Sequence, residues 1–143
     1  MLVLADNTKQ DAKKLEEVRR SQVLKAGHVL TMSDFTGKPE SDVEDLFDPS
    51  LFTRIVHSAY DLPAANALTP ESLDAADINT VRLVKKAEAA FRVMPDHIPT
   101  YDHFTPAAWL IRNPQVLDAS DAAASATLDR AETLFRAVNA ALD

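Results

Sequence analysis

The chain contains no cysteine and only two glycines among its 143 residues. The lack of cysteine excludes disulfide bonds, thiolate metal sites and cysteine nucleophiles, and it favours a cytoplasmic protein. Gly27 and Gly37 are too few to build a glycine-rich phosphate-binding loop. The chain also lacks an apolar run of roughly 18 residues and an N-terminal basic segment followed by an apolar one. We therefore expect no membrane-spanning helix, no signal peptide and no membrane partner.

The formal net charge of -7 argues against a protein that coats nucleic acid. Such binding depends on lysine and arginine side chains that neutralise phosphates. The negative charge does not exclude a metal-dependent enzyme. The two signs of charge gather in successive segments, which is typical of a solvated helix face followed by an acidic loop. The basic segment contains Lys9, Lys13, Lys14, Arg19, Arg20 and Lys25, and the acidic one contains Asp34, Glu40, Asp42, Glu44, Asp45 and Asp48.

The length and the hydrophobic content of 46% are sufficient for one core and leave little room for a second, so residues 1–143 are predicted to form one domain. Residues 2–5 predict a buried strand, residues 10–24 carry apolar side chains at helical spacing, and residues 28–32 predict a second strand. Strand, helix and strand in about thirty residues predict a βαβ unit with a parallel sheet. Residues 1–47 are therefore predicted to be α/β.

The first predicted strand opens at the start of the chain, whereas a buried parallel strand normally has neighbours on both sides. We therefore expect it to lie at a sheet edge or beside a neighbour that the chain does not supply. Self-association is the simplest way to cover an apolar edge of this kind, so we expect a homodimer.

Helical patterns dominate residues 48–143. Asp48, Pro49 and Ser50 predict the start of the first of these helices, with proline in its first turn. The expected elements are a helix over residues 49–60, a loop over 61–73 interrupted by Pro63 and Pro70, a helix over 76–93 with Ile78, Val81 and Val84 inward, an irregular connection over 94–106, a short helix over 106–112 with Trp109 and Leu110 inward, and a final helix with an apolar stripe of Leu128, Ala131, Phe135, Val138 and Leu142, widened by Leu134.

Asp6 follows the first predicted strand directly. Parallel α/β sheets bind ligands at the carboxyl ends of their strands, because strand ends and helix N-termini meet there in a crevice. More acids reach the same edge if residues 33–45 fold back beside it. Two or three carboxylates would hold Mg²⁺ or Mn²⁺ there, and such an ion activates water and stabilises a phosphoryl oxygen. The alternative is that these acids cap helices and form turns.

Residues 41–47, which read SDVEDLF, fit both interpretations. The three apolar residues of this stretch have the spacing of a helix start that contacts the core. Glu44 and Asp45 lie between them and are the candidate ligands that would join Asp6 around a metal ion.

Six stretches carry a resemblance that covers nearly the whole chain. They are LVLAD at 2–6, VLTMSDFTG at 29–37, SDVEDLFDPSLFTRIVHSAY at 41–60, VRLVKKAE at 81–88, DHFTPAAWLIRNP at 102–114 and TLDRAETLFRAVNAALD at 127–143. In this order they resemble the C-terminal TOPRIM region of OLD-family ATP-dependent endonucleases. The most specific part is VEDLF followed by an apolar helix that ends in tyrosine.

The resemblance implies a function and a set of site residues. In OLD-family proteins an ABC-type ATPase precedes a TOPRIM nuclease, in which an early glutamate, an Asp-x-Asp pair and a later acidic cluster bind divalent metal. Asp6 matches the first aspartate of the pair, and Glu44 and Asp45 match the later cluster. The resemblance thus implies that these three residues are catalytic, bind Mg²⁺ or Mn²⁺ and serve phosphodiester cleavage in DNA.

The chain departs from the family pattern at three points. Thr8 stands where the second aspartate of the pair is expected, the early glutamate would lie before Met1, and no Walker A loop is present. A two-metal nuclease holds its ions about 4 Å apart and needs enough anionic oxygens to bind both. Three carboxylates are few ligands for two ions. We therefore expect a truncated domain with little or no nuclease activity alone, whose ATPase is supplied by another domain or chain.

Other binding roles follow from the remaining polar residues. Lys9, Lys13 and Lys14 follow Asp6 and are candidate phosphate contacts for DNA; the alternative is a solvated helix face. His97 and His103 lack partners at zinc-ligand spacing, so a zinc site is not expected. The alternative function is a non-enzymatic interaction domain that binds a protein partner through an exposed sheet edge or a helical face.

Overall fold

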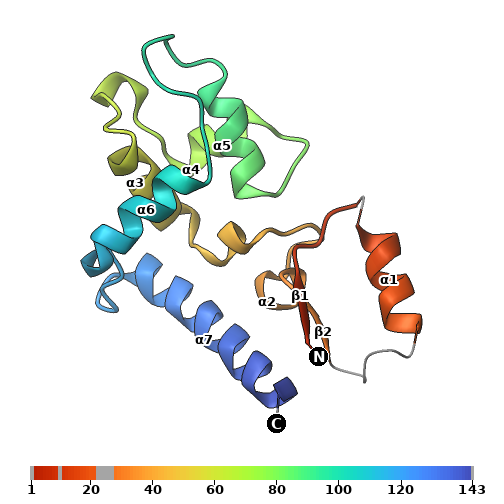
Figure 1. Cartoon of the computed structure of the whole chain (residues 1–143). Helices are drawn as coiled ribbons and strands as arrows, with labels where there is room; N and C mark the ends of the chain where they lie inside the picture. Colours follow the sequence, from red (N-terminus) through yellow and green to blue (C-terminus); the bar gives the residue numbers. More distant parts are fainter. Residues whose placement is uncertain (1, 10, 22–27, 143) are drawn as a thin grey trace.

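The computed structural model of the chain describes residues 2–9, 11–21 and 28–142. It joins a small parallel sheet to a larger body of helices (Figure 1), which confirms the predicted α/β unit followed by a helical part. The elements in chain order are β1 (Val3–Ala5), α1 (Ala12–Arg20), β2 (Val29–Thr31), α2 (Ser33–Thr36), the 3₁₀ helix η1 (Val43–Leu46), α3 (Pro49–Ala59), η2 (Ala64–Asn66), α4 (Pro70–Ala76), α5 (Leu83–Phe91), α6 (Phe104–Arg112), η3 (Pro114–Val116) and α7 (Ala122–Leu142).

The two strands pair in parallel, in the register that sets Val3 opposite Val29. α1 connects them, so the order is the predicted βαβ; residues 22–24 of the predicted helix lie outside the described residues. Val3 and Ala5 direct their main-chain hydrogen bonds toward β2, whereas Leu4 faces the outer edge of β1, where no described strand pairs with it. The Leu4 residue is 44% exposed, so the prediction of a buried strand is wrong at this position.

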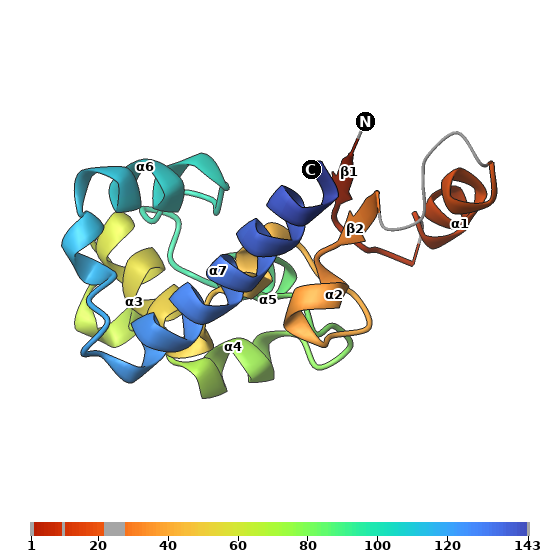
Figure 2. The same ribbon diagram turned by 90° about the horizontal axis from the view of Figure 1, so that it is seen from below.

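α1 stands beside the sheet, away from the helical body (Figures 1 and 2). None of its residues is buried. Leu15 is half-buried and Val18 is exposed, so the apolar stripe predicted for this helix covers little of the core.

α3 is the central helix of the body and separates two apolar clusters. Asp48 caps it by accepting a hydrogen bond from the Ser50 N–H at 2.9 Å, and Pro49 occupies the first turn as predicted. Trp109 and Leu110 pack inward, which confirms the prediction for α6. One cluster contains Phe52, Val56, Leu62, Leu73, Leu83, Ala87, Ala90 and Phe91, from α3, α4 and α5 and the loop between; the other contains Leu51, Ile55 and Ala124, from α3 and α7.

α7 connects the helical body to the sheet. Its Thr127 Oγ1 accepts the Asp48 N–H at 2.8 Å, its Arg130 Nη1 donates to the Leu46 carbonyl at 2.8 Å, and Leu134 packs against residues near the sheet. Phe135 and Leu142 are 65% and 66% exposed, so the predicted stripe is wrong at these two residues. The buried face of α7 is the one that contains Leu134, because α7 packs against α2, η1 and α3 on that side.

The predicted loop over residues 61–73 and helix over 76–93 are wrong in their boundaries. α4 begins at Pro70 because Thr69 accepts the Ser72 N–H at 3.2 Å and proline suits the first helical turn. The chain then becomes extended at Asp77, which accepts the Asn79 N–H at 2.9 Å in a tight turn. Ile78, predicted to face inward, is 84% exposed in this turn, and Val81, also predicted to face inward, is 38% exposed.

Candidate functional site

The segment after β2 returns to the end of β1. Asn7 and Ser41 form an antiparallel bridge, with N–H to carbonyl distances of 2.8 and 2.9 Å. This bridge brings η1 beside Asp6, so residues 33–45 meet the condition on which the predicted acidic edge depends. The amide of Asn7 also donates to Ser33 Oγ at 3.0 Å, which ties the start of α2 to the same edge.

Asp6 is exposed at the carboxyl end of β1 and approaches the acids of η1. Loss of hydration raises the pKa of Asp6, and repulsion from Asp42 and Glu44 raises it further, while the Val43 main chain and Arg82 act in the opposite direction. Asp6 and Glu44 are therefore brought close enough to interact.

Asp45 has a different environment from Asp6. It is 2% exposed, and both of its carboxylate oxygens accept hydrogen bonds. Oδ1 accepts from Lys38 Nζ at 2.6 Å and from the Leu83 N–H at 3.0 Å, and Oδ2 accepts from the Asp42 N–H at 2.9 Å. An ion that bound Asp45 would have to displace the Lys38 ammonium, so the contacts of this residue are those of a structural anchor.

Asp42 and Arg82 form a second ion pair in the same place. Arg82 Nε and Nη2 donate to the two Asp42 oxygens at 2.8 and 2.6 Å, and Asp42 is 4% exposed. We call Lys38, Asp42, Asp45 and Arg82 the buried ion-pair cluster. It joins η1 to the start of α5, and sequence spacing gave no signal of it because Arg82 lies forty residues beyond Asp42.

The three predicted ligands therefore do not converge as one set. Within residues 2–9, 11–21 and 28–142, no group of three or more His, Cys, Asp or Glu side chains is arranged to hold a metal ion. Asp6 and Glu44 remain as a pair at one edge, while Asp45 is engaged by Lys38. Binding of Mg²⁺ or Mn²⁺ by this pair stays a prediction.

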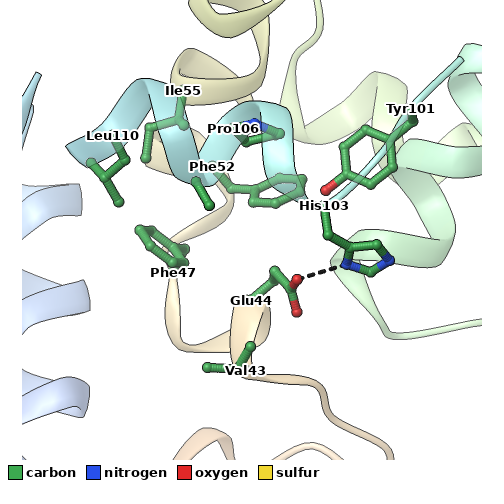
Figure 3. Close-up of a pocket in the computed structure, with 10 residues that line it drawn as sticks. Val43, Glu44, Phe47, Phe52, Ile55, Tyr101, His103, Pro106 and Leu110 are labelled. Carbon is green, nitrogen blue, oxygen red and sulfur yellow. Dashed lines mark hydrogen bonds and ion pairs between the residues drawn. The ribbon is translucent and has the colours of Figure 1, made fainter. Parts of the chain in front are cut away.

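Glu44 also faces His103, which the sequence did not single out for this edge. His103 Nδ1 lies 2.9 Å from Glu44 Oε1 (Figure 3). The pair stands at one end of a cavity of about 160 Å³ whose walls are mainly apolar. Burial raises the pKa of Tyr101, which lines the same cavity, and repulsion from Glu44 raises it further.

The three predicted phosphate contacts lie on the outer surface. Lys9 donates its main-chain N–H to Glu40 Oε1 at 2.8 Å, and its ammonium lies 3.6 Å from Glu40 Oε2. Lys13 and Lys14 are exposed on α1, with the Lys14 ammonium 4.0 Å from Asp11. Exposed lysines suit both a solvated face and phosphate contacts, so DNA binding through them stays a prediction.

Comparisons of the chain with protein-family models, curated proteins and solved structures find no match. Among the described helices, none is both long enough and apolar enough to cross a membrane.

Proposed function

We propose that this chain is a TOPRIM-like, nuclease-derived domain of the OLD type, which binds a divalent ion and DNA but does not cut DNA on its own. The observation that carries the proposal is the bridge between Asn7 and Ser41, which brings Glu44 and its neighbours to the Asp6 end of β1. This bridge supports a shared role for the strand-end aspartate and the VEDLF stretch, the two features on which the family resemblance depends. The ATPase that accompanies such domains would be supplied by another domain or chain.

The chemistry of the Asp6 and Glu44 pair suits a hard cation. Mg²⁺ commonly binds through one or two carboxylates and keeps several waters, and phosphate oxygens of DNA replace some of those waters. A bound cation also removes the repulsion that raises the Asp6 pKa. Cleavage through two metals needs a larger set of anionic oxygens, and the contact of Asp45 with Lys38 removes one member of that set.

Mn²⁺ at 10 mM is expected to raise the midpoint of thermal unfolding by about 5 °C. A ligand that binds only the folded state with a Kd of about 1 mM contributes about 1.4 kcal/mol at this concentration. Asp6→Ala and Glu44→Ala should abolish the rise, whereas Glu132→Ala, which removes an exposed acid on α7, should keep it. Differential scanning fluorimetry with Mg²⁺, Mn²⁺ and Ca²⁺ measures the shift.

Two results would contradict the proposal. A midpoint that moves for none of the three ions removes the metal site. Nicking of supercoiled plasmid by the purified chain with Mn²⁺, if it is lost in Asp6→Ala, shows that the domain is catalytically complete.

The open edge of β1 favours a second function, that of a protein-interaction domain. Leu4 lies in the middle of this edge, and the main-chain groups that it directs outward pair with no described strand. Isolated two-stranded sheets are marginally stable in water, so pairing with another strand would stabilise this one. A second copy of the chain is the simplest partner that supplies such a strand.

Light scattering coupled to size-exclusion chromatography is expected to give the mass of a dimer for the parent and of a monomer for Leu4→Lys. The lysine places a charge on the edge that the second copy would cover. Val18→Lys is the matched control, because Val18 is also exposed and apolar but lies on α1. Equal masses for the parent and Leu4→Lys would rule out association through this edge.

A further inference from the structure

The cavity between η1, α3 and α6 has the size of one small organic group. Its volume is about 160 Å³, and its far walls are formed by Phe47, Ile55 and Leu110 (Figure 3). An apolar cavity of ~150 Å³ holds one benzene molecule, whereas drug-sized ligands need about 300 Å³ or more. One ring or one branched chain therefore fits this space.

Two polar groups at the other end of the cavity have unused hydrogen-bonding capacity. Glu44 Oε1 is engaged by His103, but Oε2 forms no hydrogen bond within the described part of the chain. Tyr101 turns its hydroxyl toward the cavity (Figure 3), and this oxygen also forms no hydrogen bond with the residues that the structure describes. No described side-chain polar atom is both fully buried and unpaired, so both oxygens are accessible to a ligand.

The end of the cavity that contains Glu44 and Tyr101 has a negative electrostatic environment. The pKa of Tyr101 is raised first by burial and then by the charges of Glu44, Asp102 and Glu88, together with the neighbouring Tyr60. The cations of the buried ion-pair cluster, Lys38 and Arg82, are held by Asp45 and Asp42 and do not line the cavity. The polar end of the cavity therefore favours a group that carries positive charge.

We propose that the cavity binds a compact hydrophobic ammonium ion. The ammonium group donates hydrogen bonds to Glu44 Oε2 and to the Tyr101 hydroxyl oxygen, and the ring or branched chain packs against Phe47, Ile55 and Leu110. This site goes beyond the proposed function because it needs neither a divalent ion nor DNA. Since Glu44 is shared with the proposed ion site, the test is carried out in EDTA, and its result does not depend on whether an ion binds.

Benzylamine is the probe, and benzyl alcohol and benzoate are its neutral and anionic counterparts of nearly equal size. In titrations followed by NMR shifts of the Ala107 and Leu110 methyl groups at pH 7.5, benzylamine is expected to bind with a Kd on the order of 1 mM. Benzyl alcohol should bind about tenfold more weakly, and benzoate should cause no shift, because Glu44 attracts the cation and repels the anion.

Two variants separate the charge from the cavity. Glu44→Gln should weaken benzylamine binding about tenfold and leave benzyl alcohol unchanged, since the side chain keeps its size and loses its charge. Ala107→Leu should weaken the binding of both ligands, because Ala107 lines the cavity and the larger leucine side chain takes up part of its space. Ala107 lies on the exposed side of α6, so the substitution does not disturb the core. Glu132→Gln is the control with a distant acid and should change neither. Three results would overturn the proposal: equal affinities of the parent for benzylamine and benzyl alcohol, an affinity of Glu44→Gln for benzylamine equal to that of the parent, or no NMR shift with 20 mM benzylamine.

Discussion

Replacing Asp45 with alanine is expected to lower the free energy of unfolding by about 3 kcal/mol in buffer that contains EDTA. The substitution removes the acceptor of three hydrogen bonds, those from Lys38 Nζ and from the N–H groups of Asp42 and Leu83. The two N–H groups are left without this partner in a buried place, and the Lys38 ammonium loses its counter-ion. Urea denaturation followed by circular dichroism measures the loss.

The sign of this effect separates a structural carboxylate from a metal ligand. Carboxylates gathered around an ion repel one another when the ion is absent, so removal of one stabilises the metal-free protein. Asp45→Asn, which keeps acceptor capacity but loses the charge, should lose less stability than Asp45→Ala. Glu44→Ala is the matched control, because Glu44 is adjacent and less buried, and its side chain is bonded only to His103 among the described residues. A metal-free Asp45→Ala that is as stable as the parent would show that Asp45 does not anchor the fold.

Replacing Arg82 with methionine is expected to cost about 3 to 5 kcal/mol of the free energy of unfolding. Arg82 donates two hydrogen bonds to Asp42, and methionine fills much of the same space without donating any. The cost arises because the Asp42 carboxylate stays buried without its counter-charge, and it is measured by the same urea titration.

The double variant Arg82→Met with Asp42→Leu tests this cause. Replacing both members of a buried ion pair with apolar residues is often nearly neutral, because no uncompensated charge remains. The double variant should therefore recover most of the stability that Arg82→Met loses. If the two substitutions instead add their separate losses, the two side chains do not act as a pair.

Features that depend on neighbouring residues were predictable from the sequence. The apolar runs beside the α1 segment indicated two parallel strands, and the helix start at Asp48 and Pro49 was confirmed. The return of residues 33–45 to the end of β1 was, by contrast, only a condition of the predicted acidic edge, and the bridge between Asn7 and Ser41 meets it. Pro70 was predicted to interrupt regular structure, and this was wrong, because Thr69 caps a helix that has Pro70 in its first turn.

The sequence by itself determined which local elements form and placed an aspartate at the end of the first strand, because hydrophobic period and capping act over a few residues. Only the tertiary structure decided how the acids are used. It paired Asp42 with Arg82, Asp45 with Lys38, and Glu44 with His103. The partner of each carboxylate depends on which cation or main-chain N–H lies next to it after the chain has folded. Its role also depends on whether the folded carboxylate stays hydrated. Neither property is contained in the spacing of residues along the chain, so neighbouring acids in SDVEDLF take different roles.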